Sequence, residues 1–99
     1  MGKVIMTIGL STAAGREPEL SRWYREVHIP EARGHMSGVA GVTLYENLKL
    51  DGNSPCLLAV WEFDNEDAMK AMEGNRSRKF TPGPDYEIKL FNWFRQVPL

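Results

Sequence analysis

The chain has 99 residues, which is enough for one small domain with a single core and too few for two domains. Its 12 Lys and Arg residues nearly balance 13 Asp and Glu residues, so it lacks the basic excess that is typical of nucleic-acid-binding proteins. Hydrophobic residues make up 42% of the sequence, a share that excludes a disordered chain and indicates a globular domain.

The first third of the chain reads as a strand followed by an amphipathic helix. The run Val4–Leu10 is β-branched and apolar on both alternating faces, which is typical of a central strand that is covered on both sides. Pro18 suits the first turn of a helix. An apolar stripe at helical spacing follows: Leu20, Trp23, Tyr24 and Val27. Because Pro30 disfavours the α conformation at Ile29, we expect the helix to stop or kink near His28.

Two further strands and the turn between them form the middle of the chain. The segment Val39–Leu50 alternates apolar and mixed residues, which predicts a strand with one dry face. The cluster Asp51–Pro55 is a strong turn signal, so the runs on either side of it predict a hairpin. The next run, Cys56–Phe63, is apolar on both faces until Glu62 and predicts a second central strand.

A short helix and a last strand complete the chain. Asp64 is a good N-cap for a short helix that has Glu66 and Asp67 in its first turn and continues through the apolar residues 68–72. A polar loop over residues 75–85 leads to a strand over Tyr86–Val97. The resulting β-α-β-β-α-β order predicts one α+β domain over residues 1–99, with a ferredoxin-like fold and a four-stranded antiparallel sheet. The expected strand order is 4-1-3-2, which places the two runs that are apolar on both faces in the centre.

The predicted fold leaves one face of the sheet uncovered, because both helices of a ferredoxin-like domain pack on the other face. An apolar patch of several hundred Å² is rarely left exposed on a monomer. Covering it at ~25 cal/mol per Å² contributes on the order of 10 kcal/mol per subunit before the costs of association. We therefore expect a homodimer in which the open sheet faces pack together.

The segment 23–30 reads Trp-Tyr-Arg-Glu-Val-His-Ile-Pro and is followed at 38–42 by Gly-Val-Ala-Gly-Val. This motif resembles the dimeric α/β-barrel superfamily, and within it the EthD-like branch, in which a W-Y-x-x-x-H-I-P helix end leads to a P-G-V-like turn. Here Met-Ser-Gly at 36–38 stands in place of the usual proline. The resemblance covers the layout of the whole chain, although the motif itself spans about residues 20–46. It implies a dimeric α/β barrel of a superfamily that includes cofactor-free monooxygenases, polyketide cyclases, muconolactone isomerases and proteins without known activity.

His28 and Tyr24 are the candidate catalytic residues. A histidine with a pKa near 6.5 can accept or donate a proton at cellular pH. Tyr24 precedes it by four positions, so an α-helix would place both side chains on one face, where Tyr24 can orient His28 or hydrogen-bond a substrate oxygen. The alternative is a structural histidine that bonds a backbone carbonyl near Pro30. The resemblance favours the functional interpretation, because EthD-like proteins place this histidine at their cavity.

Further side chains are candidates for contact with a small apolar or aromatic metabolite, since ligand pockets are mostly apolar with a few polar groups. Each of them has a competing interpretation. For His35 it is simple exposure on the surface, and for the others it is packing in the core or at the dimer interface. These candidate substrate-binding residues are Trp23, His35, Tyr45, Asn47, Trp61, Phe91 and Trp93.

We expect neither a metal nor a cofactor. The chain has no glycine-rich nucleotide motif and no P-loop, and its one cysteine and two histidines are too few for common zinc sites. Its apolar runs are too short to span a bilayer, which predicts no membrane segment. The first ten residues lack signal-peptide features, and a single cysteine forbids an internal disulfide, so we expect a cytoplasmic protein.

The leading hypothesis from the sequence is a cofactor-independent enzyme that acts on a small cyclic, aromatic or polyketide-like metabolite. Its reaction would be cyclisation, dehydration or isomerisation by proton transfer at His28, as in a lyase, an isomerase or a polyketide cyclase. Two alternatives remain: a small-molecule-binding barrel without catalysis, and a cofactor-free monooxygenase.

Overall fold

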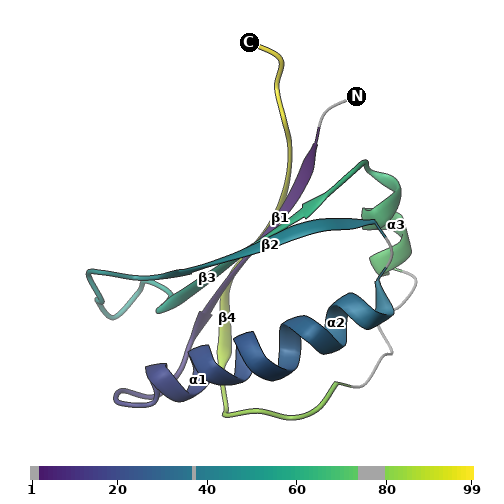
Figure 1. Cartoon of the computed structure of the whole chain (residues 1–99). Helices are drawn as coiled ribbons and strands as arrows, with labels where there is room; N and C mark the ends of the chain where they lie inside the picture. The colour runs from purple at the N-terminus through teal and green to yellow at the C-terminus, as the bar shows by residue number, and fades with distance from the viewer. Residues whose placement is uncertain (1–2, 37, 74–79) are drawn as a thin grey trace.

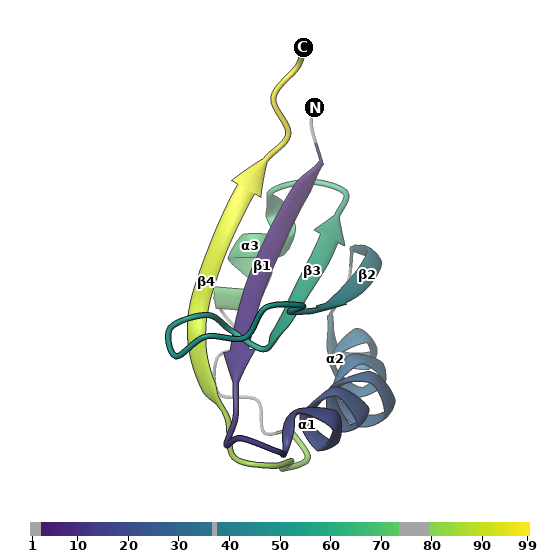
Figure 2. The ribbon, with the colours of Figure 1, turned by 90° about the vertical axis from the view of Figure 1, so that its left-hand side faces the viewer.

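The computed structural model describes residues 3–36, 38–73 and 80–99. A four-stranded antiparallel sheet carries helices on one of its faces (Figure 1). In chain order the elements are β1 (Val4–Ser11), α1 (Glu17–Trp23), η1 (Tyr24–His28), α2 (Ile29–His35), β2 (Val39–Glu46), β3 (Leu57–Phe63), α3 (Asp67–Glu73) and β4 (Glu87–Arg95). Figure 2 shows the sheet in front of α3, with both ends of the chain leaving at the same end of the sheet.

The sheet has the strand order β2-β3-β1-β4, which confirms the predicted ferredoxin-like topology. The central strands β1 and β3 pair antiparallel, with Met6 opposite Trp61. Both residues are almost fully buried, as are the other residues of the same parity in β3. The two runs that are apolar on both faces are therefore the central strands, as the sequence predicted.

The second face of the sheet has no described helix against it. Because side chains alternate along a strand, the register of the ladders assigns the opposite parity of each strand to this open face. Its apolar members are Ile5, Tyr45, Leu58, Val60, Leu90 and Phe94. Tyr45 and Phe94 are each 52% exposed. The open face is thus an apolar surface with a polar minority that includes Thr7, Thr43, Asn92 and the charged Glu62.

Of the two outcomes predicted near His28, a stop or a kink, the stop is wrong, because the helix continues past Pro30. Residues 17–35 are helical without a break, and the middle of this stretch, η1, is a π-helical turn. The N–H of Ile29 donates to the carbonyl of Tyr24, five residues earlier. A proline in an α-helix collides with the carbonyl of the residue four positions before it, here Glu26. The wider π turn accommodates Pro30, so the helix continues to His35.

Two boundaries differ from the prediction because asparagine side chains replace backbone partners. The second strand ends at Glu46 and not at Leu50, since the Asn47 amide donates to the carbonyl of Pro55 and accepts the N–H of Lys49, both at 2.8 Å. The short helix α3 begins at Asp67, whose N–H donates to the side chain of Asn65.

Two further boundary differences concern Asp64 and the last strand. Because Asn65 caps α3, Asp64 is not the N-cap. The last strand covers Glu87–Arg95 and is shorter than predicted at both ends. Within the predicted loop, residues 75–79 lie outside the described part of the chain.

The core between helix and sheet makes a direct prediction about stability. Leu20 of α1 is fully buried, whereas Leu48 in the turn after β2 is 99% exposed. The substitution Leu20→Ala should lower the free energy of unfolding by ~2–5 kcal/mol, because it removes buried methyl groups and leaves a cavity. The matched control Leu48→Ala should change it by less than ~0.5 kcal/mol. Urea unfolding followed by circular dichroism at one protein concentration measures both, and equal effects would contradict the assigned core.

Candidate functional site

His28 lies within a group of aromatic side chains between the helix and the sheet. It is the last residue of η1, and its side chain is half-buried. The centroid of its ring lies 4.8 Å from that of Tyr24, 5.1 Å from Trp23, 5.2 Å from Phe80 and 6.5 Å from Trp61. We call these five side chains the His28 cluster.

The π turn explains why Trp23 belongs to the His28 cluster. On an α-helix the neighbours of a residue lie three and four positions away, so positions 23 and 28 would diverge. The wider turn of a π-helix brings residues five positions apart onto one side. The rings of Trp23 and His28 are only 31° from parallel. The helix therefore presents Trp23, Tyr24 and His28 together.

Two nitrogens of the His28 cluster are buried and make no hydrogen bond. Among the buried side-chain polar atoms of the described residues, only Trp23 Nε1 and His28 Nδ1 lack a partner. Leaving such a group unpaired costs roughly 1–3 kcal/mol, and most buried polar groups in proteins are paired. A structural histidine would form a hydrogen bond between its ring and a backbone carbonyl. Within the described residues, His28 Nδ1 forms no such bond. The His28 cluster thus retains unused capacity to bind polar atoms.

Burial sets the protonation state of both candidate catalytic groups. It lowers the pKa of the His28 imidazole below 6.5, an effect that the nearby Glu31 carboxylate partly opposes. It also raises the pKa of Tyr24 to about 12, with the hydrogen bond from Trp61 acting in the opposite direction. At neutral pH the site therefore holds a neutral imidazole, which can accept a proton, beside a neutral phenol, which can donate a hydrogen bond.

The segment 80–86 crosses the His28 cluster on its outer side. Phe80 meets the imidazole edge-on. Thr81 donates its N–H and its hydroxyl to the two carboxylate oxygens of Glu31, at 2.6 and 2.5 Å. These bonds lower the pKa of the Glu31 carboxyl. Glu31 follows His28 by three positions, so the carboxylate ties the loop to the same helix.

Gly83 and Tyr86 of the same segment pack against Trp23. A Cβ atom built on Gly83 would overlap the Trp23 indole, so the loop passes too close to the ring for any larger residue. The ring of Tyr86 stacks on Trp23 with centroids 5.8 Å apart. Together with Phe80, these contacts cover the indole and the imidazole.

No sequence pattern predicts that the residues of this loop, or Glu31, belong to the site. The available signal was Phe80, which is the one aromatic residue between Phe63 and Tyr86 in the sequence. The polar residues on either side of Phe80 in the sequence show no periodicity, so they do not predict where its side chain lies. Only the fold brings it onto His28.

Three of the predicted substrate-binding residues lie elsewhere on the helix-covered side. His35 ends α2 and is exposed, and its ring lies 6.0 Å from that of Phe80. Phe91 and Trp93 lie on β4 at the parity of the helix-covered face. Their rings contact each other, and Trp93 contacts Phe63, while no ring contact with the imidazole occurs in the described residues.

Tyr45 and Asn47 are not brought to His28. Tyr45 pairs with Leu58 and so belongs to the open face, on the opposite side of the sheet. Asn47 holds the turn that follows β2. Trp61 does belong to the His28 cluster. Its side chain is 1% exposed, and it contacts the cluster as a buried hydrogen-bond partner of Tyr24.

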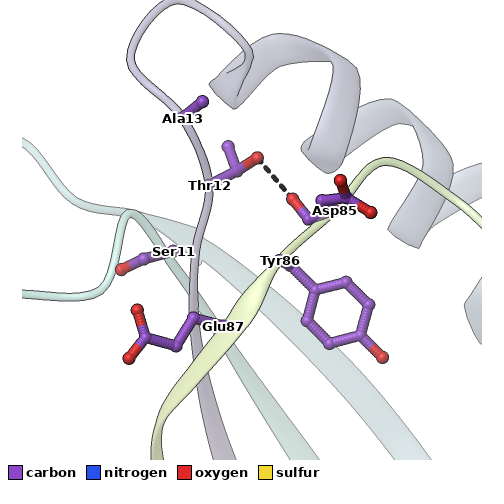
Figure 3. A pocket seen from close by; sticks show the side chains of 6 residues that line it. All are labelled: Ser11, Thr12, Ala13, Asp85, Tyr86 and Glu87. Atoms are coloured by element: carbon purple, nitrogen blue, oxygen red, sulfur yellow. Dashed lines mark hydrogen bonds between the residues drawn. The ribbon is translucent and has the colours of Figure 1, made fainter.

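A shallow pocket of about 330 Å³ lies where β1 ends and β4 begins (Figure 3). Tyr86, which also stacks on Trp23, is one of its lining residues, and its ring points away from Ser11 and Glu87 in Figure 3. The hydroxyl of Thr12 donates to the carbonyl of Asp85 at 2.7 Å and joins the two strand ends. The pocket contains no imidazole and no unpaired buried nitrogen among the described side chains that line it. The candidate chemistry therefore lies in the His28 cluster.

No protein-family model and no curated protein matches this sequence. Among solved structures, the chain is similar to a candidate monooxygenase from Shewanella loihica PV-4, with a TM-score of 0.66 over 99% of this chain and 97% of that chain. The two sequences are 9% identical, so the similarity concerns the fold. It supports the ferredoxin-like α+β fold that the order of the elements predicts.

Within ranges 3–36, 38–73 and 80–99, no three His, Cys, Asp or Glu side chains come together in a way that could hold a metal ion. None of the helices assigned there has the length and apolar character needed to cross a membrane.

The lowered pKa of His28 predicts a pH dependence of stability. As the pH falls below about 6.5, the unfolded chain takes up a proton on this histidine before the folded chain does, so the free energy of unfolding decreases. The slope contributed by one histidine is at most ~1.4 kcal/mol per pH unit. The His28→Asn variant should lack this contribution in urea unfolding series between about pH 7.5 and 5.5.

His35→Asn is the matched control, because it removes the exposed histidine of the same continuous helix. If wild type and His28→Asn lose stability in parallel as the pH falls, the imidazole is not the group responsible.

Proposed function

We propose that the protein is a cofactor-independent enzyme that transfers protons on a small cyclic, aromatic or polyketide-like metabolite bound in the His28 cluster. One observation carries this proposal: two buried nitrogens without partners lie beside the Tyr24 phenol, within a group of packed aromatic rings. Aromatic walls suit a flat ligand, and few converging polar groups suit its oxygen atoms. A bound ligand would satisfy the groups that the folded chain leaves unpaired.

The proposed reaction starts at a carbon next to a carbonyl group. The neutral His28 imidazole accepts the proton as the C–H bond breaks, and the electron pair of that bond forms an enolate. The enolate oxygen accepts a hydrogen bond from Tyr24, which stabilises the developing charge. The imidazolium then returns the proton to another position of the ligand. Return to another carbon gives isomerisation. In dehydration the proton instead goes to a hydroxyl group that leaves as water, and in cyclisation the enolate carbon attacks a second carbonyl and the proton goes to the alkoxide that forms.

The resemblance of segment 23–30 to the EthD-like branch supports this assignment, because members of that branch have this histidine at a cavity. The name of the Shewanella loihica PV-4 neighbour instead favours a monooxygenase as the second candidate. The two differ in one reactant, since an oxygenase consumes O₂ and a proton-transfer enzyme does not. Turnover that stops under anaerobic conditions would identify the second candidate.

Proton transfer at His28 is tested with 1-tetralone, an aryl ketone whose α-protons exchange with solvent through its enolate. In D₂O, wild-type protein should accelerate deuterium incorporation at that carbon, as followed by proton NMR. The substitution His28→Ala should reduce the catalysed rate by ~10²–10⁴, the usual contribution of a positioned acid–base group. His35→Ala, which removes the exposed histidine, should retain the rate.

Two results would contradict this proposal. Full exchange in His28→Ala would remove this histidine from the mechanism. If wild-type protein binds aryl ketones and lactones but exchanges none of their α-protons, the function is that of a small-molecule-binding barrel without catalysis.

We also propose that the protein forms a homodimer through the open face of the sheet. The six apolar side chains of that face come from all four strands, and the helices lie on the other side (Figure 2). A flat apolar sheet face is best covered by an identical face, because a two-fold axis brings equal surfaces together. The His28 cluster lies on the opposite side of the sheet, so each subunit would carry its own site.

The dimer is tested at Val60, which pairs with Thr7 and Thr43 in the middle of the open face. Light scattering at about 10 µM should give the mass of a dimer for wild type. Val60→Asp should give a monomer, since it places a charge in an apolar interface. Leu50→Asp, at an exposed apolar residue of the turn after β2, is the control and should remain dimeric. A wild-type chain that is monomeric at this concentration would refute the interface.

A further inference from the structure

The hydrogen bond between Trp61 and Tyr24 limits what Tyr24 can offer to a ligand. Trp61 Nε1 lies 3.0 Å from the Tyr24 hydroxyl oxygen. An indole N–H can only donate, so the phenol oxygen is the acceptor in this bond. The hydroxyl makes no second hydrogen bond to any part of the chain that the structure describes. The proton of Tyr24 is therefore unused, while its acceptor position is occupied.

Neither residue can easily leave this arrangement. Trp61 lies on the central strand β3, between Met6 of β1 and Val42 of β2. Trp61 is 1% exposed and Tyr24 is 2% exposed, so bulk water does not replace either partner. Burial raises the pKa of Tyr24 to about 12, and the phenol keeps its proton at neutral pH.

We infer that Trp61 is a positioning residue that makes Tyr24 a donor-only group and thereby selects ligands with a hydrogen-bond-accepting oxygen, such as a ketone or an enolate. A phenol has one favourable acceptor position in the plane of its ring, opposite its own proton, and the Trp61 N–H occupies it. The unpaired Trp23 Nε1 is likewise donor-only. A carbonyl oxygen has two lone pairs and can accept from both groups.

The Trp61 bond also strengthens Tyr24 as a donor, since hydrogen bonds in a chain polarise one another at low dielectric. This effect grows as negative charge develops on the accepting oxygen. The inference rests on the proposed function, because it requires a ligand held in the His28 cluster. It adds to that function the chemical class of the oxygen that the site recognises.

A matched pair of probes tests the inference. 1-Tetralone and 1-tetralol share one skeleton and differ in a carbonyl group against a hydroxyl group. Their affinities for wild type and for Trp61→Phe can be measured by NMR titration. The variant retains an aromatic ring but frees the Tyr24 oxygen to accept from an alcohol. The ratio of ketone affinity to alcohol affinity should therefore fall by about 5- to 10-fold, the usual effect of one hydrogen bond.

The control variant is Trp93→Phe, which changes a tryptophan of β4 that contacts Phe63 and Phe91. It should leave the ratio unchanged. A loss of affinity in Trp61→Phe that is equal for both probes indicates a purely structural role and overturns the inference.

Tyr24→Phe provides a second route that does not depend on whether Trp61→Phe folds. This variant keeps the ring, loses the hydroxyl and should bind 1-tetralone about 5- to 10-fold more weakly. Adding Trp61→Phe to it should not change the ratio further, because Trp61 acts through the missing hydroxyl. Unaltered ketone affinity in Tyr24→Phe would refute the inference.

The outcomes separate this inference from the proposed function. If wild type binds both probes but the ratio does not respond to Trp61→Phe, only the role of Trp61 is refuted. If wild type binds neither probe, the proposed ligand class fails and the inference fails with it.

Discussion

Pro30 and the π turn before it are the constraint on which the helical layer depends. The proline removes one N–H from the helix and displaces the carbonyl of Glu26, which would end an ordinary α-helix. The chain instead widens by one residue at η1 and continues. Leu20 before the turn and Ala32 after it are both buried, so the helix keeps one face on the sheet on either side of the turn. The same turn gathers Trp23, Tyr24 and His28 on one side.

The site differs from the rest of the molecule in how its polar groups are satisfied. Outside the His28 cluster, side chains such as Asn47 and Thr12 find backbone partners at ordinary distances. Inside it, two buried nitrogens remain unpaired although a small domain has little stability to spare. Pairing within the cluster is selective, because Trp61 bonds Tyr24 while Trp23 bonds nothing described. Such a pattern is expected where a ligand completes the hydrogen bonds.

Strand alternation separates the proposed site from the proposed dimer interface. Trp61 and Leu58 lie on the same strand, three residues apart, and therefore face opposite sides of the sheet. The helix-covered side holds the imidazole, the phenol and the indoles. The open side holds aliphatic and aromatic side chains from all four strands. A change on one side therefore need not disturb the other, provided that the sheet itself remains intact.

Local periodicity was sufficient to predict most elements and to place Tyr24 and His28 on one helix face, because alternation and helical spacing reflect burial over a few residues. The strand order followed from the order of these elements and the rules of strand connection. Periodicity was not sufficient for the passage through Pro30, where packing on the sheet overrides a local preference. Nor did it reveal that Phe80 covers the imidazole or that Glu31 holds Thr81. The bonds from Trp61 to Tyr24 and from Thr81 to Glu31 join residues 37 and 50 positions apart. Contacts at such separations arise only when the β-α-β-β-α-β chain closes its layers, so the tertiary structure alone determines which groups remain unpaired around His28.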